Sequence, residues 1–186
     1  MSAPFDPQVL RSKLADAETA LTANEKGHAY EGALRYVFEA TGCLVEQNLT
    51  NIGGAEEVDL GVGNLGSFPL LPRIFLVECK DWDARVDSKT VGYFLNIVRN
   101  RSFELAIIVA PKGLTGDDSD MSFAHSLGTG AAAQNIRIVV ITTDDLLVIA
   151  STAEFVNLLH RRYLRAGVNG GVGVPKPDDH QLMRQS

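Results

Sequence analysis

The sequence has few cysteines, no long apolar run and no excess of basic residues. Cys43 and Cys79 are the only cysteines among 186 residues, and neither belongs to a CxxC pair. This argues against a disulfide framework and gives little support for a zinc site. No apolar run approaches the roughly 20 residues that would cross a bilayer. The N-terminal residues show no charged leader followed by a hydrophobic stretch. We therefore expect a reduced, cytoplasmic protein with no membrane contact.

The formal net charge of −6 at first argues against a polyanionic partner, but the charge is spread unevenly. Residues 31–72 carry six acidic side chains and only one basic side chain, Arg35. Residues 73–112 carry seven basic side chains against five acidic ones. A site that binds a divalent metal must be locally acidic, and the bound cation then reverses the local sign. The net charge therefore does not exclude nucleic acid.

The hydrophobic fraction of 45% suits one globular domain with a sizeable core. Composition and periodicity divide the chain into an N-terminal helical extension over 1–26, a main domain over 27–166 and a tail over 167–186. The tail is rich in glycine, proline and polar residues, which predicts that it is flexible.

Hydrophobic spacing predicts an α/β fold. Helices are expected at about 8–23, 28–40, 86–100, 119–133, 144–149 and 154–165, and strands at about 43–47, 57–62, 73–79, 105–110 and 136–142. Short early links favour antiparallel neighbours, whereas the later strand–helix–strand units favour parallel crossovers. The order predicts a mixed sheet with helices on both sides.

Two carboxylates and a lysine lie where the second and third predicted strands could meet. Strand alternation places Glu78 and Lys80 on one face, and pairing of the two strands would bring Asp59 toward Glu78. Two carboxylates this close repel unless a cation compensates. Mg²⁺ suits this role because it binds one or two carboxylates and keeps several waters. Such a centre can hydrolyse a phosphodiester, with an ammonium to stabilise the developing charge. From the residues alone, a structural Glu–Lys pair with Asp59 in an exposed turn remains an alternative.

A resemblance to a known family favours the metal centre. Asp59, Glu78 and Lys80, set in strands after a helix that bears Glu31, resemble the PD-(D/E)XK nuclease superfamily. The chain is most similar to its Mrr-like restriction endonuclease branch. The matching stretches are 27–42, 56–62, 75–82, the helix after Val86, and 105–115. The resemblance implies a restriction-endonuclease-like three-layer α/β/α fold with a mixed central sheet, and makes residues 27–166 the nuclease domain.

The resemblance also implies roles for individual residues. Asp59 and Glu78 would bind Mg²⁺, for which Mn²⁺ would substitute, together with the backbone carbonyl of Cys79. Lys80 would be the catalytic lysine, and Glu31 the additional acidic residue that many members use to hold a metal or its waters. Many Mrr-like members have glutamine at the position of Glu78. The glutamate here is closer to the wider superfamily and to Holliday-junction resolvases.

The implied function is metal-dependent endonucleolytic cleavage of DNA in defence (restriction), repair or recombination. RNA is not excluded as a substrate. The sequence has no helix-turn-helix or zinc module, so loops, homodimerisation or a partner protein would supply targeting. The alternative is a catalytically silent domain of the same fold that acts as a nucleic-acid-binding or assembly subunit.

Three other features receive weaker interpretations. The GxGxxG sequence at 61–66 lacks room for a following helix, which argues against a dinucleotide-binding fold and favours a hairpin loop near the active edge. His28 lies three residues before Glu31 and could reach the site. Arg161, Arg162 and Arg165 form a stripe on the last long helix, for which a solvated surface is the default interpretation and phosphate contact the alternative.

Overall fold

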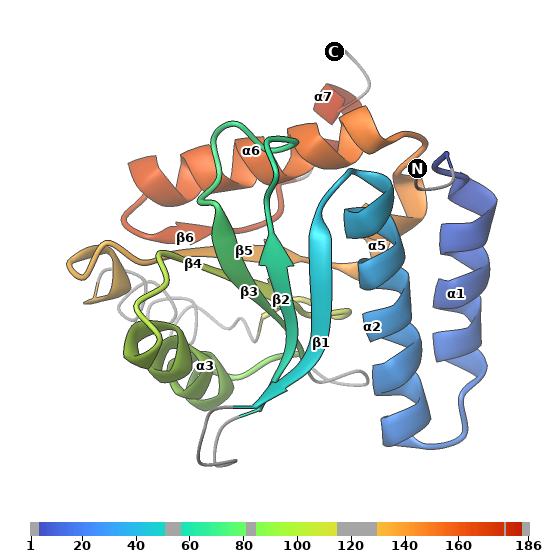
Figure 1. The fold of residues 1–186 in the computed structure, drawn as a ribbon, viewed down its shortest axis with the longest axis horizontal. Coiled ribbons are helices and arrows are strands. Elements are labelled where there is room, and N and C mark those ends of the chain that lie inside the picture. The colour runs from blue at the N-terminus through green and yellow to red at the C-terminus, as the bar shows by residue number, and fades with distance from the viewer. Residues whose placement is uncertain (1–3, 51–56, 81–84, 115–129, 177, 184–186) are drawn as a thin grey trace.

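The computed structural model describes residues 4–50, 57–80, 85–114, 130–176 and 178–183, and its centre is a six-stranded sheet in the order β1-β2-β3-β4-β5-β6 (Figure 1). The strands are β1 (Leu44–Thr50), β2 (Glu57–Gly63), β3 (Ile74–Cys79), β4 (Leu105–Val109), β5 (Arg137–Ile141) and β6 (Val172–Gly173). β2 is antiparallel to both β1 and β3, and the pairs from β3 to β6 are parallel. The mixed sheet expected from the sequence is therefore confirmed.

Helices cover both faces of the sheet and make three layers. They are α1 (Pro7–Thr19), α2 (Ala23–Ala40), α3 (Ser88–Asn100), α5 (Thr143–Val148), α6 (Thr152–Val168) and α7 (Asp179–Leu182). One core lies between the sheet and α1, α2 and α6, and the other lies between the sheet and α3. This agrees with the restriction-endonuclease-like α/β/α arrangement. No helix within the described ranges is long and apolar enough to cross a membrane.

Helix α2 begins five residues earlier than the hydrophobic spacing indicated. Thr22 is its N-cap and accepts a hydrogen bond from the backbone N–H of Glu25, whose carboxylate accepts one from the backbone N–H of Thr22. This capping box satisfies two donors that the first helical turn cannot satisfy itself. The helix therefore includes the last residues of the segment 1–26 that composition had assigned to an extension.

The described residues after 166 pack against the domain, contrary to the flexible tail that composition indicated. β6 extends the sheet beside β5. Asp179, which is 1% exposed, accepts hydrogen bonds from Arg162, Arg165 and the backbone N–H of Lys176. Gly173 allows close approach, since a Cβ there would lie 2.0 Å from the carbonyl oxygen of Arg162. Side-chain contacts from α6 therefore anchor a segment whose composition resembles a mobile tail.

The interpretation of the arginine stripe on α6 as solvated surface is wrong for Arg162. Its side chain is fully buried and donates to both carboxylate oxygens of Asp145, at 2.6 Å each. Although burial alone would raise the pKa of Asp145, the guanidinium of Arg162 holds that pKa below its usual value. Helical spacing alone could not show this, because Asp145 and Asp179 each lie 17 residues from Arg162.

The glycine-rich segment between β2 and β3 is a hairpin loop with no helix, as expected, but it does not lie near the active edge. Asn64 organises it by donating to the carbonyl of Phe68 and accepting from the backbone N–H groups of Gly66 and Phe68. The loop joins the end of β2 to the start of β3, whereas Asp59 and Glu78 lie near the opposite ends of those strands. The helix expected over 119–133 falls mostly outside the described residues.

Candidate active site

The pairing of β2 and β3 ends at the two carboxylates singled out in the sequence. The last paired residues are Leu60 and Val77, so Asp59 and Glu78 come next on opposite strands. Asp59 accepts a hydrogen bond from the backbone N–H of Cys79 at 2.6 Å. Glu78 in turn accepts a long one, of 3.4 Å, from the backbone N–H of Asp59. These side-chain hydrogen bonds thus take the place of the next backbone pair between the two strands. We call the end of this pairing, at Asp59 and Glu78, the fork.

Lys80 lies against the carboxylate of Glu78. Its Nζ is 2.9 Å from Glu78 Oε1, and the lysine side chain is 42% exposed whereas that of Glu78 is 4% exposed. Lys80 donates its backbone N–H to the carbonyl of Val109 on β4, which extends the parallel pairing past the end of β3. The backbone is therefore fixed on both sides of the fork, and Lys80 presents a cation at its solvent side.

Helix α2 brings Glu31 toward Asp59 from the layer beside the sheet. Glu31 is buried, and its Oε2 has no hydrogen-bond partner among the described residues. His28 Nδ1 is 3.5 Å from that oxygen, too long for a strong hydrogen bond. His28 is thus placed beside the acidic group, as its spacing of three residues from Glu31 allowed.

Burial and mutual repulsion make all three carboxyl groups weaker acids than usual. Burial, followed by the charge of Asp59, raises the pKa of Glu78 to about 7 although Lys80 opposes the change. Burial also raises the pKa of Asp59 and of Glu31, and the charge of Asp59 adds to the increase for Glu31. Burial would lower the pKa of Lys80, but its contacts with Glu78 outweigh this and raise it. Lys80 therefore remains protonated, but its charge does not offset the effects of burial and repulsion on the pKa of Glu78.

Glu78→Gln should stabilise the metal-free protein at pH 8 by about 1 to 3 kcal/mol, because glutamine removes a buried charge with little change of shape. The pKa of Glu78 is raised in the folded state, so its contribution to stability is fully present below the ordinary carboxyl pKa and is lost as the pH rises toward 7. Urea unfolding at pH 5 and pH 8 in EDTA measures this. The stabilisation should be small at pH 5, and Glu46→Gln on exposed β1 should change little at either pH. Destabilisation by Glu78→Gln at pH 8 would contradict this electrostatic description.

The donor set fits a hard divalent cation bound largely through water. In the described part of the chain, no group of three or more His, Cys, Asp or Glu side chains is placed so that together they could hold a metal ion. Mg²⁺ does not require one, since it binds through one or two carboxylates and retains waters. The unpartnered oxygen of Glu31 and the raised pKa values of Asp59 and Glu78 are both consistent with a missing positive charge. In an extended strand the carbonyl of Cys79 lies on the same side as its N–H, which contacts Asp59.

The structure places Asp59, Glu78, Lys80 and the backbone of Cys79 in contact at the fork, and Glu31 lies near enough for the charge of Asp59 to raise its pKa. It excludes the alternative in which Asp59 sits in an exposed turn, because Asp59 lies within β2 and is partly buried. Sequence reasoning missed the cap that the carboxylate of Asp59 makes on the N–H of Cys79. No sequence signal could have shown this contact, because the sequence does not tell where the pairing of β2 and β3 ends.

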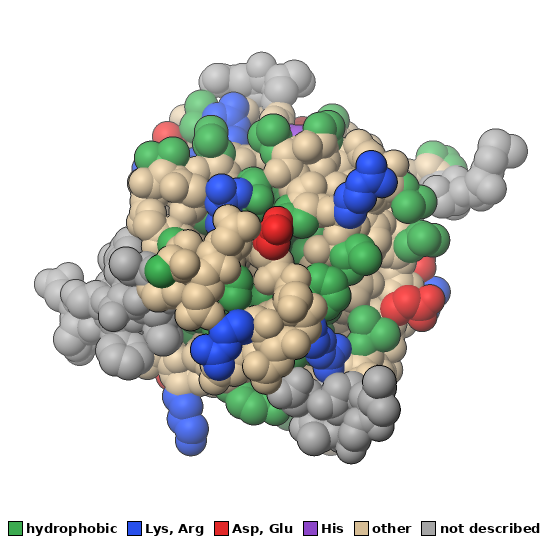
Figure 2. All heavy atoms as spheres, turned by 60° about the vertical axis from the view of Figure 1, so that its left-hand side comes forward, with side chains coloured by type: hydrophobic (Ala, Val, Ile, Leu, Met, Phe, Trp, Pro, Cys, Tyr) green, Lys and Arg blue, Asp and Glu red, His purple; other side chains and the backbone are tan. Residues whose placement is uncertain are grey.

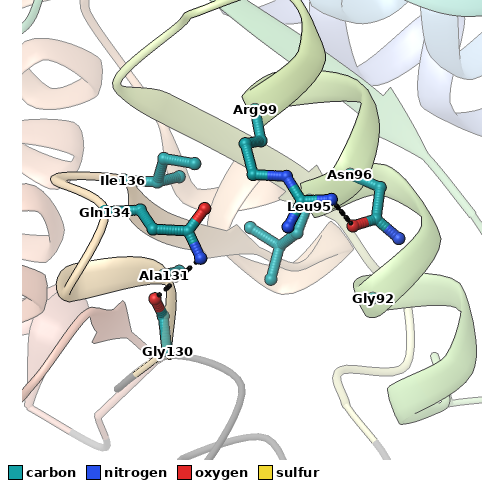
Figure 3. Close-up of a pocket in the computed structure, with 8 residues that line it drawn as sticks. All are labelled: Gly92, Leu95, Asn96, Arg99, Gly130, Ala131, Gln134 and Ile136. Carbon is teal, nitrogen blue, oxygen red and sulfur yellow. Dashed lines mark hydrogen bonds between the residues drawn. The ribbon is translucent and has the colours of Figure 1, made fainter.

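A separate cavity of about 270 Å³ lies between α3 and the segment 130–136 (Figure 3). Asn96 and Arg99 on α3 face Gln134 across it, and Arg99 donates to Asn96 at 2.9 Å. None of the fork residues lines this cavity. This cavity is therefore separate from the fork.

Comparison with known families agrees with this geometry. A family model named Mrr_cat and described as restriction endonuclease matches residues 22–149, which is more than half of the chain. The match begins at Thr22, the N-cap of α2, and contains the fork, Glu31 and Lys80. A search of curated proteins found no match.

Proposed function

This chain belongs to the Mrr-type restriction endonuclease family, and from that premise we propose that it is a metal-dependent endonuclease that hydrolyses DNA phosphodiester bonds. The observation that carries the proposal is the fork itself. There Asp59 and Glu78 end the strand ladder through reciprocal contacts, and Lys80 lies 2.9 Å from Glu78. A structural ion pair between Glu78 and Lys80 would need neither the partly buried carboxylate of Asp59 nor a buried oxygen of Glu31 that has no hydrogen-bond partner among the described residues.

Asp59 and Glu78 would hold Mg²⁺ or Mn²⁺, with the carbonyl of Cys79 and with Glu31 as a further ligand to the metal or its waters. When bound, the cation supplies withdrawal of charge from the phosphate and activation of water. The backbone N–H of Cys79 holds the carboxylate of Asp59 in place.

Lys80 would orient the attacking water and stabilise the negative charge that develops on the phosphate. Its raised pKa keeps it protonated, and its side chain is exposed enough to meet a substrate. Lys80 would be free to turn from Glu78 toward a substrate if a bound cation neutralised the carboxylate of Glu78.

The surface is compatible with a polyanionic substrate in spite of the acidic net charge. Figure 2 shows a face on which Lys and Arg side chains are more widespread than acidic ones and lie among exposed hydrophobic side chains. Such a distribution can attract DNA locally, whereas the net charge limits tight binding over the whole surface. A homodimer or a targeting partner would add the contacts that select a site in restriction, repair or recombination.

Incubation with supercoiled plasmid, branched DNA and single-stranded RNA tests the proposal. We expect nicking or linearisation of DNA with Mg²⁺ or Mn²⁺ and none in EDTA. Closed circular plasmid identifies endonucleolytic cleavage because it has no ends. Absence of cleavage with every substrate and metal, with the protein folded, would contradict the proposal.

A catalytically silent binding or assembly subunit is the second candidate. Two observations favour it. Glu78 already makes an ion pair with Lys80, and no group of three or more ligand-type side chains among the described residues could hold a metal ion. The two candidates differ in one result. A silent domain would bind DNA or a protein without metal-dependent cleavage, whereas the proposed nuclease would cleave.

A further inference from the structure

A cavity of about 300 Å³ lies between α6 and the loop that joins β2 to β3, two elements that lie side by side in Figure 1. Arg137, at the start of β5, lines it together with Tyr163 and Gly167 of α6. No lining residue is acidic. The other lining residues are aliphatic, and each is more than half exposed: Leu70, Leu164 and Val168.

Helix α6 holds the guanidinium of Arg137 in a fixed orientation. Its Nη1 donates a hydrogen bond to the hydroxyl of Tyr163, and its Cζ lies 4.6 Å from the centroid of the Tyr163 ring. The atoms Nε and Nη2 make no hydrogen bond or ion pair with any described residue. Since a guanidinium has five N–H donors, Arg137 keeps most of its donors for a ligand.

Gly167 leaves the side of the guanidinium that carries Nε and Nη2 uncovered. A Cβ at this position would lie 3.4 Å from Nε and 3.7 Å from both Cζ and Nη2 of Arg137. Glycine weakens a helix relative to alanine, and Gly167 lies inside α6, which continues to Val168. The missing side chain therefore keeps a partly buried cation within reach of solvent.

The unpaired nitrogens of Arg137 suit a carboxylate. Two adjacent N–H groups of a guanidinium can bind both oxygens of one carboxylate or phosphate group. The exposed aliphatic side chains around Arg137 favour a carboxylate on a polypeptide, because aliphatic neighbours of that carboxylate can pack against them. A DNA backbone would meet one cation among apolar side chains, whereas DNA-binding surfaces rely on several cations.

A second copy of this chain fits the cavity less well. A symmetric dimer places the same patch of both copies face to face. It would therefore bring the two Arg137 side chains together with no acidic lining residue to separate their charges. Charge complementarity favours a different protein with an acidic contact segment.

The cavity lies away from the fork. Arg137 begins β5, and the parallel pairing of β3, β4 and β5 places the start of β5 opposite the end of the sheet where β3 reaches the fork. Helix α6 also lies outside residues 22–149, which match the family model. A protein bound at this cavity would therefore leave the fork open to a substrate.

We propose that this cavity docks a segment of a partner protein in which a glutamate or aspartate lies beside aliphatic side chains. The carboxylate binds Nε and Nη2 of Arg137, and the aliphatic side chains pack on Leu164, Val168 and Leu70. The inference goes beyond the nuclease activity and does not depend on it.

Nuclear magnetic resonance of the full chain, labelled with ¹⁵N, tests the docking site with the peptide acetyl-Leu-Glu-Leu-Leu-amide. The Nε–H signal of Arg137 and the backbone amide signal of Gly167 should shift in the same saturable titration. The peptide with glutamine in place of glutamate should bind roughly tenfold more weakly, because it loses the charge-assisted hydrogen bonds. The peptide acetyl-Gly-Glu-Gly-Gly-amide should also bind more weakly, because it lacks the aliphatic contacts.

Two variants test the geometry of the site. Arg137→Lys keeps the charge but loses the paired donors, and it should weaken binding of the glutamate peptide roughly tenfold. Gly167→Leu places a good helix former over the guanidinium, so it should weaken binding while the thermal unfolding midpoint stays the same or rises. Arg99→Lys, at an exposed arginine on α3, is the matched control and should bind the peptide like the wild type.

Three results would overturn the proposal. One is equal binding of the glutamate and glutamine peptides, or peptide binding that is unchanged in both Arg137→Lys and Gly167→Leu. Another is a shift of the Arg137 signal with duplex DNA and none with the peptide, which would make the cavity a phosphate contact. The third is a dimer in analytical ultracentrifugation that dissociates in Leu164→Glu, which would make a second copy the occupant.

Discussion

Asp59→Asn should slow DNA cleavage by roughly a thousandfold, which corresponds to a loss of about 4 kcal/mol of transition-state stabilisation. Asparagine keeps an oxygen that can accept the hydrogen bond from Cys79, so the fork should retain its backbone geometry. It removes the negative charge that a divalent cation requires. Single-turnover cleavage of plasmid at saturating Mg²⁺ measures the change, with calorimetry to follow metal binding.

Glu46→Gln is the matched control for Asp59→Asn. Glu46 lies on the edge strand β1, exposed and opposite Gly61, so its replacement removes one nearby negative charge without touching the fork. Cleavage by this variant should stay within about twofold of wild type, as expected for a surface substitution. Cleavage by Asp59→Asn at the wild-type rate would show that the fork is not the hydrolytic centre.

Arg162→Ala should destabilise the protein by about 3 to 5 kcal/mol, because it leaves the carboxylate of Asp145 buried without its main cation and removes one of the two arginines that contact Asp179. Arg162 is fully buried and also donates to the carbonyl of Val140 on β5. Its loss therefore affects α5, the sheet and the C-terminal segment together. Urea unfolding followed by circular dichroism measures the change at pH 7.

Two comparisons test the cause of this destabilisation. Arg161→Ala, on the same helix, removes a 3.5 Å contact with the carbonyl of Leu182 and should cost less than about 1 kcal/mol. The depressed pKa values of Asp145 and Asp179 contribute stability above the ordinary carboxyl pKa that is lost as the pH falls through their folded values. The cost of Arg162→Ala should consequently shrink in acid. A cost that did not depend on pH would indicate lost packing in place of lost charge pairing.

Local patterns were sufficient to predict the sheet and to bring Asp59 and Glu78 near each other. The alternation of Ile74, Leu76 and Glu78 and the apolar run of β4 reflect burial of each strand, and burial is what a hydrophobic pattern reports. The strand order then brought Asp59 opposite Glu78, because antiparallel neighbours pair residue by residue. Hydrophobic spacing missed the start of α2, although Thr22 and Glu25 have the spacing of a capping box.

The C-terminal segment could not be predicted in this way. Its glycines and polar residues have the composition of a tail, and tertiary contacts such as the pairing of β6 with β5 and those of Asp179 with two arginines on α6 give it a fixed place. Such contacts depend on tertiary structure, which periodicity does not report. The position of the β2–β3 loop was missed for a related reason, because the direction of β2 determines which end of the hairpin faces the site.

The most direct test is the position of Mn²⁺ in crystals of the wild-type protein, located by anomalous scattering. We predict an ion in contact with carboxylate oxygens of Asp59 and Glu78, with Lys80 displaced from its ion pair with Glu78. Mn²⁺ bound only elsewhere, at concentrations that support DNA cleavage, would contradict the assignment of the fork as the metal centre.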